Sequence, residues 1–220
     1  IAPGKVESLT GFFAVDKGDA DIRMVYDASK SGLNEKLWAP SFCLSTVDST
    51  FRAIESTTRL GDLDLGEMFL NFKLHKFIRP YAGVDLTAYV SADLSGASTG
   101  TPCWERWERC LMGLKPSPYN ATRAFAWCEE VIRGDPSDDR NALRWDRVRL
   151  NLPGEATYDP TLPWLSKVVE DLPCERIAGD FFSYIDDIRS SGCSVDECWN
   201  VSRRVASYCG YLGIQDAPRK

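Results

Sequence analysis

The sequence predicts an α+β fold, in which antiparallel hairpins are combined with amphipathic helices. Residues 10–15 and 21–26 are β-rich runs joined by a turn at Lys17-Gly18-Asp19, which is typical of a hairpin. Residues 181–190 form a second β-rich stretch, with two adjacent acids near its centre. Residues 121–132 carry apolar side chains at i, i+3, i+4 spacing, which predicts a helix with one apolar face.

The acids Asp186 and Asp187 are the feature around which the site is predicted. Buried charges must be paired or bind a metal ion, so a central strand does not hold two of them side by side without a partner. A hairpin resolves this conflict: residues 181–185 run up, the acids form the tip and residues 188–190 run back. Two carboxylates at a tight turn suit an oxygen-preferring ion such as Mg²⁺. An Asp-Asp pair is also common in solvated turns that bind nothing, so the pair alone leaves both interpretations open.

The first hairpin carries charged residues, and we expect Lys17, Arg23 and Asp27 to cluster around its turn. Basic side chains on a two-stranded finger suit contacts with a triphosphate. An exposed hairpin with ordinary surface charge would show the same pattern, so neither interpretation is preferred on these residues.

Residues 45–58 predict a helix with a hydroxyl cap at its start and an apolar face for packing. Residues 60–65 predict a strand in which Asp62 and Asp64 face the same side, because the side-chain period of a strand is two. A carboxylate where a core strand ends is a common place for a ligand site. Solvated acids on an edge strand would give the same sequence, so this interpretation stays open too.

The middle of the chain predicts a strand at 81–90, a loop at 92–101 and a strand at 104–111 that pairs back. Residues 111–118 are a Gly/Pro-rich turn that opens the next helix. A glycine there would let the backbone approach a ligand closely, and the start of a helix favours anions. A turn that only begins the helix and binds no ligand would have the same composition.

The last third begins with residues 134–178, whose mixture of Asp, Arg, Pro, Asn and Trp predicts an irregular, partly ordered insertion. Ser194 and Glu197 have the spacing of a capping box, which predicts a helix with Trp199 on its apolar face. Residues 211–214 predict a final strand.

Composition excludes several classes of protein. The net charge of −6 argues against a protein that coats nucleic acid, and it predicts weak binding to nucleic acid by this chain alone. Eight cysteines without a C-x-x-C pair, and a single histidine, argue against a zinc site and predict reduced thiols. No run of about 18 apolar residues and no secretion signal is present, so we expect no membrane span and an intracellular protein, cytoplasmic or nuclear. The abrupt ends of the sequence read as those of a piece of a longer protein.

Taken together, five segments in order resemble reverse transcriptases of the retroelement type, from about residue 10 to residue 220 apart from the insertion. They are residues 23–27 with Asn34, residues 63–69 with Leu74, residues 111–118, Tyr184-Ile185-Asp186-Asp187, and residues 212–214 with Lys220. The resemblance implies the right-hand polymerase fold, with an antiparallel palm sheet backed by helices. Residues 1–60 and about 80–110 would be fingers-like, and residues 61–79 and 111–220 palm-like, without a thumb or an RNase H region.

The resemblance also implies an activity: RNA-directed DNA synthesis by a mobile element such as a retrotransposon, on an RNA or DNA template with a primer and deoxynucleoside triphosphates. Two Mg²⁺ ions, with Mn²⁺ as the alternative, would bind to Asp64, Asp186, Asp187 and the backbone of Leu65. Other implied roles are phosphate contacts by Lys17 and Arg23, exclusion of a ribose 2′-hydroxyl by Phe69, a nucleotide pocket at Met112, Gly113 and Lys115, and protonation of pyrophosphate by Lys220. No membrane is implied, and the oligomeric state does not follow.

The sequence departs from the family's pattern at Met112, at Pro116 and in the length of residues 134–178. Two alternatives therefore remain. One is a domesticated, catalytically inactive descendant that binds nucleic acid or acts as a scaffold, against which the presence of all three expected aspartates weighs. The other is an RNA-dependent RNA polymerase with the same palm, against which Phe69 weighs, because a small residue there would favour ribonucleotides.

Overall fold

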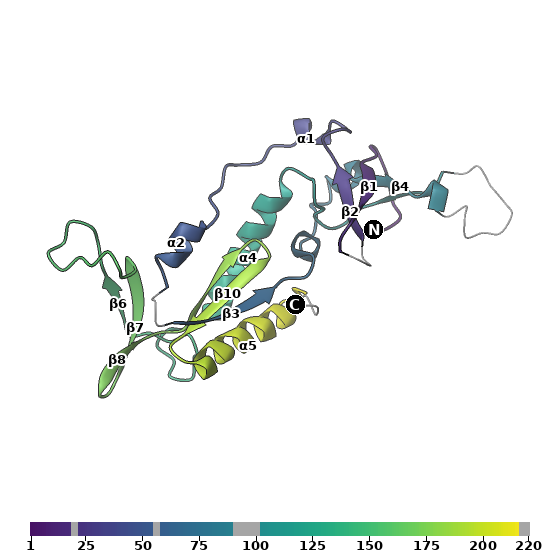
Figure 1. Ribbon diagram of the computed structural model, residues 1–220. Coiled ribbons are helices and arrows are strands. Elements are labelled where there is room, and N and C mark those ends of the chain that lie inside the picture. Colours follow the sequence, from purple (N-terminus) through teal and green to yellow (C-terminus); the bar gives the residue numbers. More distant parts are fainter. Residues whose placement is uncertain (19–21, 55–57, 90–101, 216–220) are drawn as a thin grey trace. The chain divides into compact units, whose positions relative to one another are not determined.

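The computed structural model describes residues 1–18, 22–54, 58–89 and 102–215, and its chain forms two compact units (Figure 1). The first unit contains Ile1–Phe42 and Phe69–Arg123, and the second contains Cys43–Met68 and Ala124–Lys220. Each unit combines helices with antiparallel strands, which is the predicted α+β class. The boundaries between these two units differ from the fingers and palm boundaries that were predicted from the sequence.

The first unit is built on two small antiparallel sheets. Strands β1 (Gly11–Asp16) and β2 (Ile22–Asp27) form the predicted hairpin. Strands β4 (Gly83–Asp85) and β5 (Trp104–Arg106) also pair, as predicted, but both are shorter than expected. The predicted loop at 92–101 lies outside the described residues.

Short helical segments connect the sheets of the first unit. They are α1 (Leu33–Lys36), the 3-10 turn η2 (Arg79–Tyr81) and the 3-10 turn η1 (Met68–Asn71), which begins at the boundary between the units. The core of this unit is formed by Ala28, Leu33, Leu74, Ala82, Val84, Trp107, Cys110, Leu111 and Leu114.

The second unit is organised around a three-stranded antiparallel sheet of order β3-β10-β9. Its strands are β3 (Arg59–Asp64), β9 (Asp180–Tyr184) and β10 (Asp187–Gly192). Figure 1 shows α5 (Val195–Tyr211) lying along this sheet, and α4 (Ser117–Arg133) reaches it with its C-terminal half. The hairpin predicted for residues 181–190 is thus confirmed, and its strands are held against helices.

One face of this sheet is sealed by the helices. Ile188 and Ser190 are buried on it, and a Cβ on Gly61 would lie 2.9 Å from the Ser190 hydroxyl and 3.3 Å from the Cys198 sulfur. From α4, the Arg133 guanidinium stacks 4.4 Å from the centre of the buried Phe181 ring. Because side chains alternate along a strand, the neighbouring residues of β3, β9 and β10 project from the opposite face.

Helix α5 begins as predicted, since the Ser194 hydroxyl accepts a hydrogen bond of 3.1 Å from the Glu197 backbone N–H. Its end differs from prediction, because the helix continues to Tyr211 where a strand was expected. Gly213 then adopts a φ of +76°, and the Ile214 N–H donates to the Cys209 carbonyl over 2.8 Å. This is the Schellman ending, for which glycine is the favoured residue.

The buried face of α5 is formed by Cys198, Val201, Val205 and Cys209. Trp199, which was expected on the apolar face, is 61% exposed. A helix has 3.6 residues per turn, so a side chain next to a buried one points roughly 100° away from it. The prediction for Trp199 was therefore wrong.

Helix α2 (Val47–Phe51) has the predicted hydroxyl cap, a reciprocal pair of hydrogen bonds between Thr46 and Ser49. It ends at Phe51, well before residue 58, and residues 55–57 lie outside the described part of the chain. Val47 and Phe51 are 73% and 62% exposed, so the expected apolar face is not packed into a core.

The segment 134–178 is ordered, which corrects the prediction of an irregular insertion. It contains a three-stranded antiparallel sheet, with β6 (Arg147–Leu150), β7 (Leu165–Asp171) and β8 (Cys174–Ile177) in that order. The loop between β6 and β7 is organised by Asn151, whose side-chain amide donates to the Asp159 carbonyl over 2.7 Å and whose side-chain oxygen accepts from the Asp159 N–H over 2.9 Å. Polar side chains thus stabilise a segment whose composition resembles that of disordered segments.

All eight cysteines are free thiols, and four of them are buried, which agrees with the expectation of reduced core residues. None of the helices in the described residues is long and apolar enough to cross a membrane.

Candidate functional site

Two aspartates pair at one end of the β3-β10-β9 sheet, and a third adjoins them in the neighbouring turn. Asp187, the first residue of β10, pairs directly with Asp64, the last residue of β3. Side chains that lie directly opposite in an antiparallel pair share a face of the sheet, with Cβ atoms ~5 Å apart. Asp186 adjoins them in the turn before β10, and its carbonyl accepts a 2.8 Å hydrogen bond from the Leu65 N–H. Sheet register therefore brings together carboxylates that are remote in the sequence.

The acids occupy the face of the sheet that α5 leaves uncovered. Asp62 and Arg189 lie on the same face, one pair further along, and form a 2.8 Å ion pair. A groove of about 740 Å³ runs over this face. From the sheet it is lined by Asp62, Asp64, Phe182, Tyr184, Asp187 and Arg189, and from residues 45–54 by Thr46, Val47, Thr50, Phe51 and Ile54. The groove thus combines three carboxylates, one of them paired with Arg189, with aromatic and aliphatic walls.

The turn that carries Asp186 is strained. Asp187 pairs with Tyr184, so the turn has two residues, Ile185 and Asp186. Ile185 has a φ of 55°, which is a genuine outlier for a β-branched residue. Glycine is the usual residue where the first position of a two-residue hairpin needs a positive φ. Backbone strain of this kind clusters at functional sites and persists only where neighbouring contacts hold it. Here the Leu65 N–H donates to the Asp186 carbonyl and holds the turn.

Replacing Ile185 by asparagine is expected to raise the free energy of unfolding by about 1 kcal/mol, because asparagine tolerates the left-handed region that isoleucine resists. Urea unfolding of the two proteins measures the change. Ile185→Ala is the control, since alanine keeps the Cβ that causes the strain. A gain of equal size in both variants would mean that the half-buried isoleucine side chain, and not its φ, limits stability.

The donor chemistry at this edge fits Mg²⁺, which prefers carboxylate oxygens. Asp64 is half-buried, and Asp186 and Asp187 are exposed, so the latter two are open to an ion from solvent. Among the residues that the structure describes, no group of three His, Cys, Asp or Glu side chains is already gathered as a metal cluster. The structure places Asp64 and Asp187 side by side at the end of the sheet, with Asp186 next to Asp187 in the turn.

In the first unit, the turn at 111–118 is clamped by Asn34 of α1. The Asn34 side-chain amide donates to the Gly113 carbonyl over 2.8 Å, and its oxygen accepts from the Lys115 N–H over 2.8 Å. Gly113 has a φ of +94°, and a Cβ there would lie 2.0 Å from the Tyr26 carbonyl oxygen. The close approach that glycine permits is thus to the protein's own strand β2. The sequence placed Asn34 in a motif but did not indicate this role.

The other candidate residues of the first unit are placed separately. Met112 is 40% exposed and Lys115 is exposed on the same turn, while Phe69 is half-buried and packs against the core of this unit. Lys17 follows β1, and Arg23 lies in β2 opposite Val15; both are exposed.

Asp27 does not join Lys17 and Arg23, which corrects the expected cluster. It pairs with Gly11 at the far end of the hairpin, where its carboxylate accepts hydrogen bonds from the backbone N–H groups of Ser29 and Lys30. Lys220 lies outside the described residues.

Comparison with solved structures finds a similar fold in the protease–reverse transcriptase of a foamy virus, in complex with double-stranded DNA. The TM-score is 0.60 and the sequence identity is 16%. The match covers 99% of this chain and 27% of that chain. No family model and no curated protein matches the sequence. At this identity the likeness concerns the fold, and the chain is distantly similar in fold to a reverse transcriptase.

Proposed function

We propose that this chain is the polymerase region of an RNA-directed DNA polymerase, with residues 1–60 and about 80–110 as fingers and residues 61–79 and 111–220 as palm. The observation that carries the proposal is the pairing of Asp64 with Asp187, next to Asp186 in a strained two-residue turn. These are the residues that the resemblance to reverse transcriptases had singled out, and they come together through sheet register. The fold similarity to a reverse transcriptase structure supports the same conclusion independently of sequence identity.

Asp64, Asp186 and Asp187 would hold two Mg²⁺ or Mn²⁺ ions, with the backbone carbonyl of Leu65 as a further ligand. Bound ions would supply Lewis-acid chemistry, which makes a primer 3′-hydroxyl more acidic and neutralises charge on the triphosphate. The protein's own contribution is to hold the carboxylates at the edge of a rigid sheet. The hydrogen bond between the Leu65 N–H and the Asp186 carbonyl fixes the turn relative to β3.

Residues of the first unit would bind the incoming deoxynucleotide. Lys17 and Arg23 would contact its phosphates, and the turn bearing Met112, Gly113 and Lys115 would line its pocket. Phe69 would exclude a ribose 2′-hydroxyl. Lys220 would donate a proton to the leaving pyrophosphate. The partners of such an enzyme are a primed RNA or DNA template and deoxynucleoside triphosphates.

Primer extension on an RNA template tests the proposal, with the longest natural form of the protein, Mg²⁺ and deoxynucleotides. We expect extension that stops when the ions are chelated and returns when Mg²⁺ is restored. A folded protein that binds the primed template but never extends it would contradict the proposal. That result would favour the second candidate, a non-enzymatic nucleic-acid-binding descendant. The observation in favour of this candidate is that the sequence departs from the family's pattern at Met112 and Pro116, next to the predicted nucleotide pocket.

Replacing Phe69 by alanine is expected to let the enzyme incorporate ribonucleotides, with the ratio of ribonucleotide to deoxynucleotide efficiency rising roughly a hundredfold (~2.7 kcal/mol). The physical reason is that a bulky ring would no longer occupy the space next to the 2′-carbon. The measurement is single-nucleotide extension with each triphosphate. Phe69→Tyr serves as the control, since it keeps the ring. Unchanged discrimination in Phe69→Ala would show that the ring only packs in the core.

A further inference from the structure

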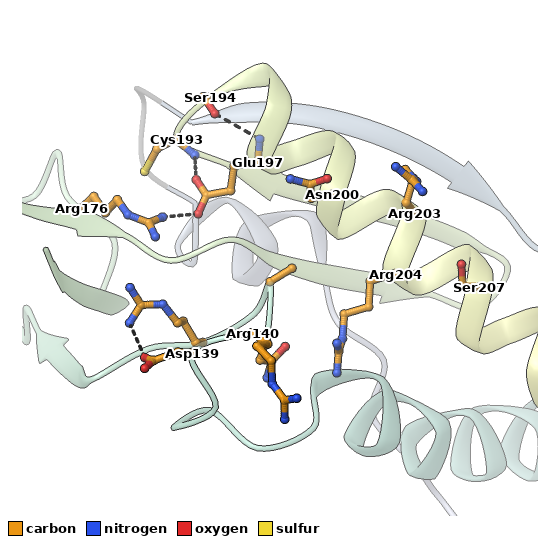
Figure 2. Close-up of a pocket in the computed structure, with 13 residues that line it drawn as sticks. Asp139, Arg140, Arg176, Cys193, Ser194, Glu197, Asn200, Arg203, Arg204 and Ser207 are labelled. Atoms are coloured by element: carbon orange, nitrogen blue, oxygen red, sulfur yellow. Dashed lines mark hydrogen bonds and ion pairs between the residues drawn. The ribbon is translucent and has the colours of Figure 1, made fainter.

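A second hollow, of about 840 Å³, lies in the second unit and shares no lining residue with the groove above Asp64. Figure 2 shows its walls: Asn200, Arg203, Arg204 and Ser207 project from α5, and the turn that bears Asp139 and Arg140 lies opposite. The hollow is on the side of the sheet that α5 covers, whereas the carboxylate groove is on the uncovered side. The two sites are therefore separate. We call this hollow the arginine pocket.

The arginine pocket is named for its five guanidinium groups, from Arg140, Arg144, Arg176, Arg203 and Arg204. Three of them are held by carboxylates. Arg140 pairs with Asp138 at 3.2 Å, Arg144 pairs with Asp171 at 3.0 Å and Asp139 at 3.6 Å, and Arg176 pairs with Asp171 and Glu197. Five cations thus face four carboxylates, which leaves a local positive excess in a chain whose net charge is −6.

The remaining two arginines, Arg203 and Arg204, have no carboxylate within ion-pair distance among the described residues. The Arg204 Nε donates to the Ile132 carbonyl over 2.6 Å, and its guanidinium lies 4.8 Å from the centre of the Tyr208 ring. These contacts hold the group in place without neutralising its charge. Arg203 is exposed. The pocket therefore offers one positioned and one available guanidinium on adjacent residues of α5.

The titration of a neighbouring acid agrees with a positive potential here. The pKa of the Asp138 carboxyl lies below its usual range, chiefly because the Arg140 side chain donates a hydrogen bond to it. The Arg140 backbone N–H and the charges of Arg140 and Arg204 lower it further. The charge of Arg204 is thus one of the smaller causes that lower the pKa of Asp138.

An exposed aromatic ring neighbours Arg203 on α5. Trp199 is 61% exposed and precedes Arg203 by four residues, so the two side chains are neighbours on the surface of α5. Bases stack on such rings whatever their sequence, and guanidinium groups bind phosphate with paired hydrogen bonds. Asn200 and Ser207 add polar groups to the same wall.

We propose that the arginine pocket binds the phosphates of a single nucleic-acid strand through Arg203 and Arg204, while a base of that strand stacks on Trp199. That the anion is a nucleic acid rests in part on the proposed function, because guanidinium groups also bind other anions. The site would hold a strand on the face of the sheet opposite to the carboxylates. It would thus retain a template or product strand outside the polymerase groove.

The test is fluorescence anisotropy with a labelled 12-nucleotide single strand of mixed sequence, as DNA and as RNA, with the longest natural form of the protein. Arg203→Gln is expected to weaken binding about tenfold, the loss of one charge-assisted contact. The slope of log affinity against log salt should also fall by about 0.7, the value for one phosphate of a single strand. Arg59→Gln, which removes an exposed arginine of the same unit outside the pocket, is the matched control and should bind within about twofold of wild type.

Substitutions of Trp199 provide a second, independent test of the proposal. Trp199→Ala should weaken binding about tenfold, and Trp199→Phe should restore most of the loss, because a phenyl ring still stacks. Wild-type affinity in both Arg203→Gln and Trp199→Ala would overturn the proposal. A second result would also overturn it: pyrophosphate or polyglutamate binds with the same dependence on Arg203, and the oligonucleotide does not displace it. The ligand of the pocket would then be a small anion or an acidic peptide.

These experiments can contradict the polymerase proposal and the strand-binding proposal independently of each other. Primer extension that is absent, with strand binding that still depends on Arg203 and Trp199, would contradict the polymerase and leave the strand site standing. Extension that depends on Mg²⁺, with strand binding indifferent to both residues, would contradict the strand site alone.

Discussion

An Asp186→Asn variant is expected to fold normally and to add deoxynucleotides at least about a thousandfold more slowly than the wild type, a loss of ~4 kcal/mol of transition-state stabilisation. Asparagine keeps the size of the side chain but removes the negative charge that would hold an ion. The backbone is spared, because the contact that ties this turn to β3 is made by the Asp186 carbonyl and the Leu65 N–H. Single-turnover primer extension measures the rate, and urea unfolding verifies the fold.

Asp62→Asn is the matched control for this loss. Asp62 lies on the same face of the sheet, one pair away from Asp64, but its partner is Arg189. It is exposed, so we expect less than about 1 kcal/mol change in stability and nearly unchanged extension. Asp64→Asn should behave like Asp186→Asn, because Asp64 is the residue paired with Asp187. Equal extension by wild type and Asp186→Asn would point to a contaminating polymerase or to a different site.

The hairpin at 180–192 could be predicted from the sequence because a local conflict had only one solution. Two adjacent charges cannot occupy the middle of a buried strand, so the chain had to turn at Asp186. The pairing of Asp187 with Asp64 could not be predicted in this way. Register depends on how β3 meets β10 through contacts that are distant in the sequence, and no local pattern in residues 60–65 specifies its partner. Only the resemblance to reverse transcriptases put the three aspartates in one site.

Two errors in the fold have separate physical causes. Residues 211–214 have β-forming side chains, but α5 continues until Gly213 provides the left-handed residue that ends it. Residues 134–178 have a composition typical of disorder. The Asn151 side chain nevertheless makes hydrogen bonds with the Asp159 backbone N–H and carbonyl, which an apolar side chain could not do. Strand β6 has the sequence Arg-Val-Arg-Leu, whose alternation was a visible signal for a strand. Amino-acid composition therefore gave a wrong prediction for this segment, whose structure depends on hydrogen bonds made by polar side chains.

The arginine pocket had no signal in the sequence, because its residues come from three separate segments. Arg140 belongs to a turn, Arg176 to β8, and Arg203 and Arg204 to α5. Trp199 was assigned to the buried face of its helix, and its exposure is what makes it a candidate for stacking. The site thus depends on packing that only the three-dimensional structure reveals.

Replacing Gly113 by alanine is expected to lower the free energy of unfolding by about 2–4 kcal/mol. Two terms add: the positive φ of +94° costs ~1 kcal/mol for a residue with a Cβ, and overpacking costs roughly 1–3 kcal/mol. The overlap is severe because the Cβ would lie 2.0 Å from the Tyr26 carbonyl oxygen, which belongs to the backbone of β2. A backbone atom cannot rotate away as a side chain can. Relief therefore requires the turn to leave β2, which would also stretch both hydrogen bonds of Asn34.

Gly32→Ala isolates the first term, the cost of the positive φ. Gly32 also has a positive φ, +75°, and lies in the same unit, but nothing is within 4 Å of the Cβ that alanine would add. We expect a loss of only about 1 kcal/mol there, from backbone strain alone. Urea unfolding of both variants measures the difference, and near-ultraviolet circular dichroism reports on Trp107, whose ring packs edge-on against Tyr26 at 5.1 Å. Equal losses in the two variants would mean that the 111–118 turn moves away from β2 without cost, and that Asn34 does not clamp it.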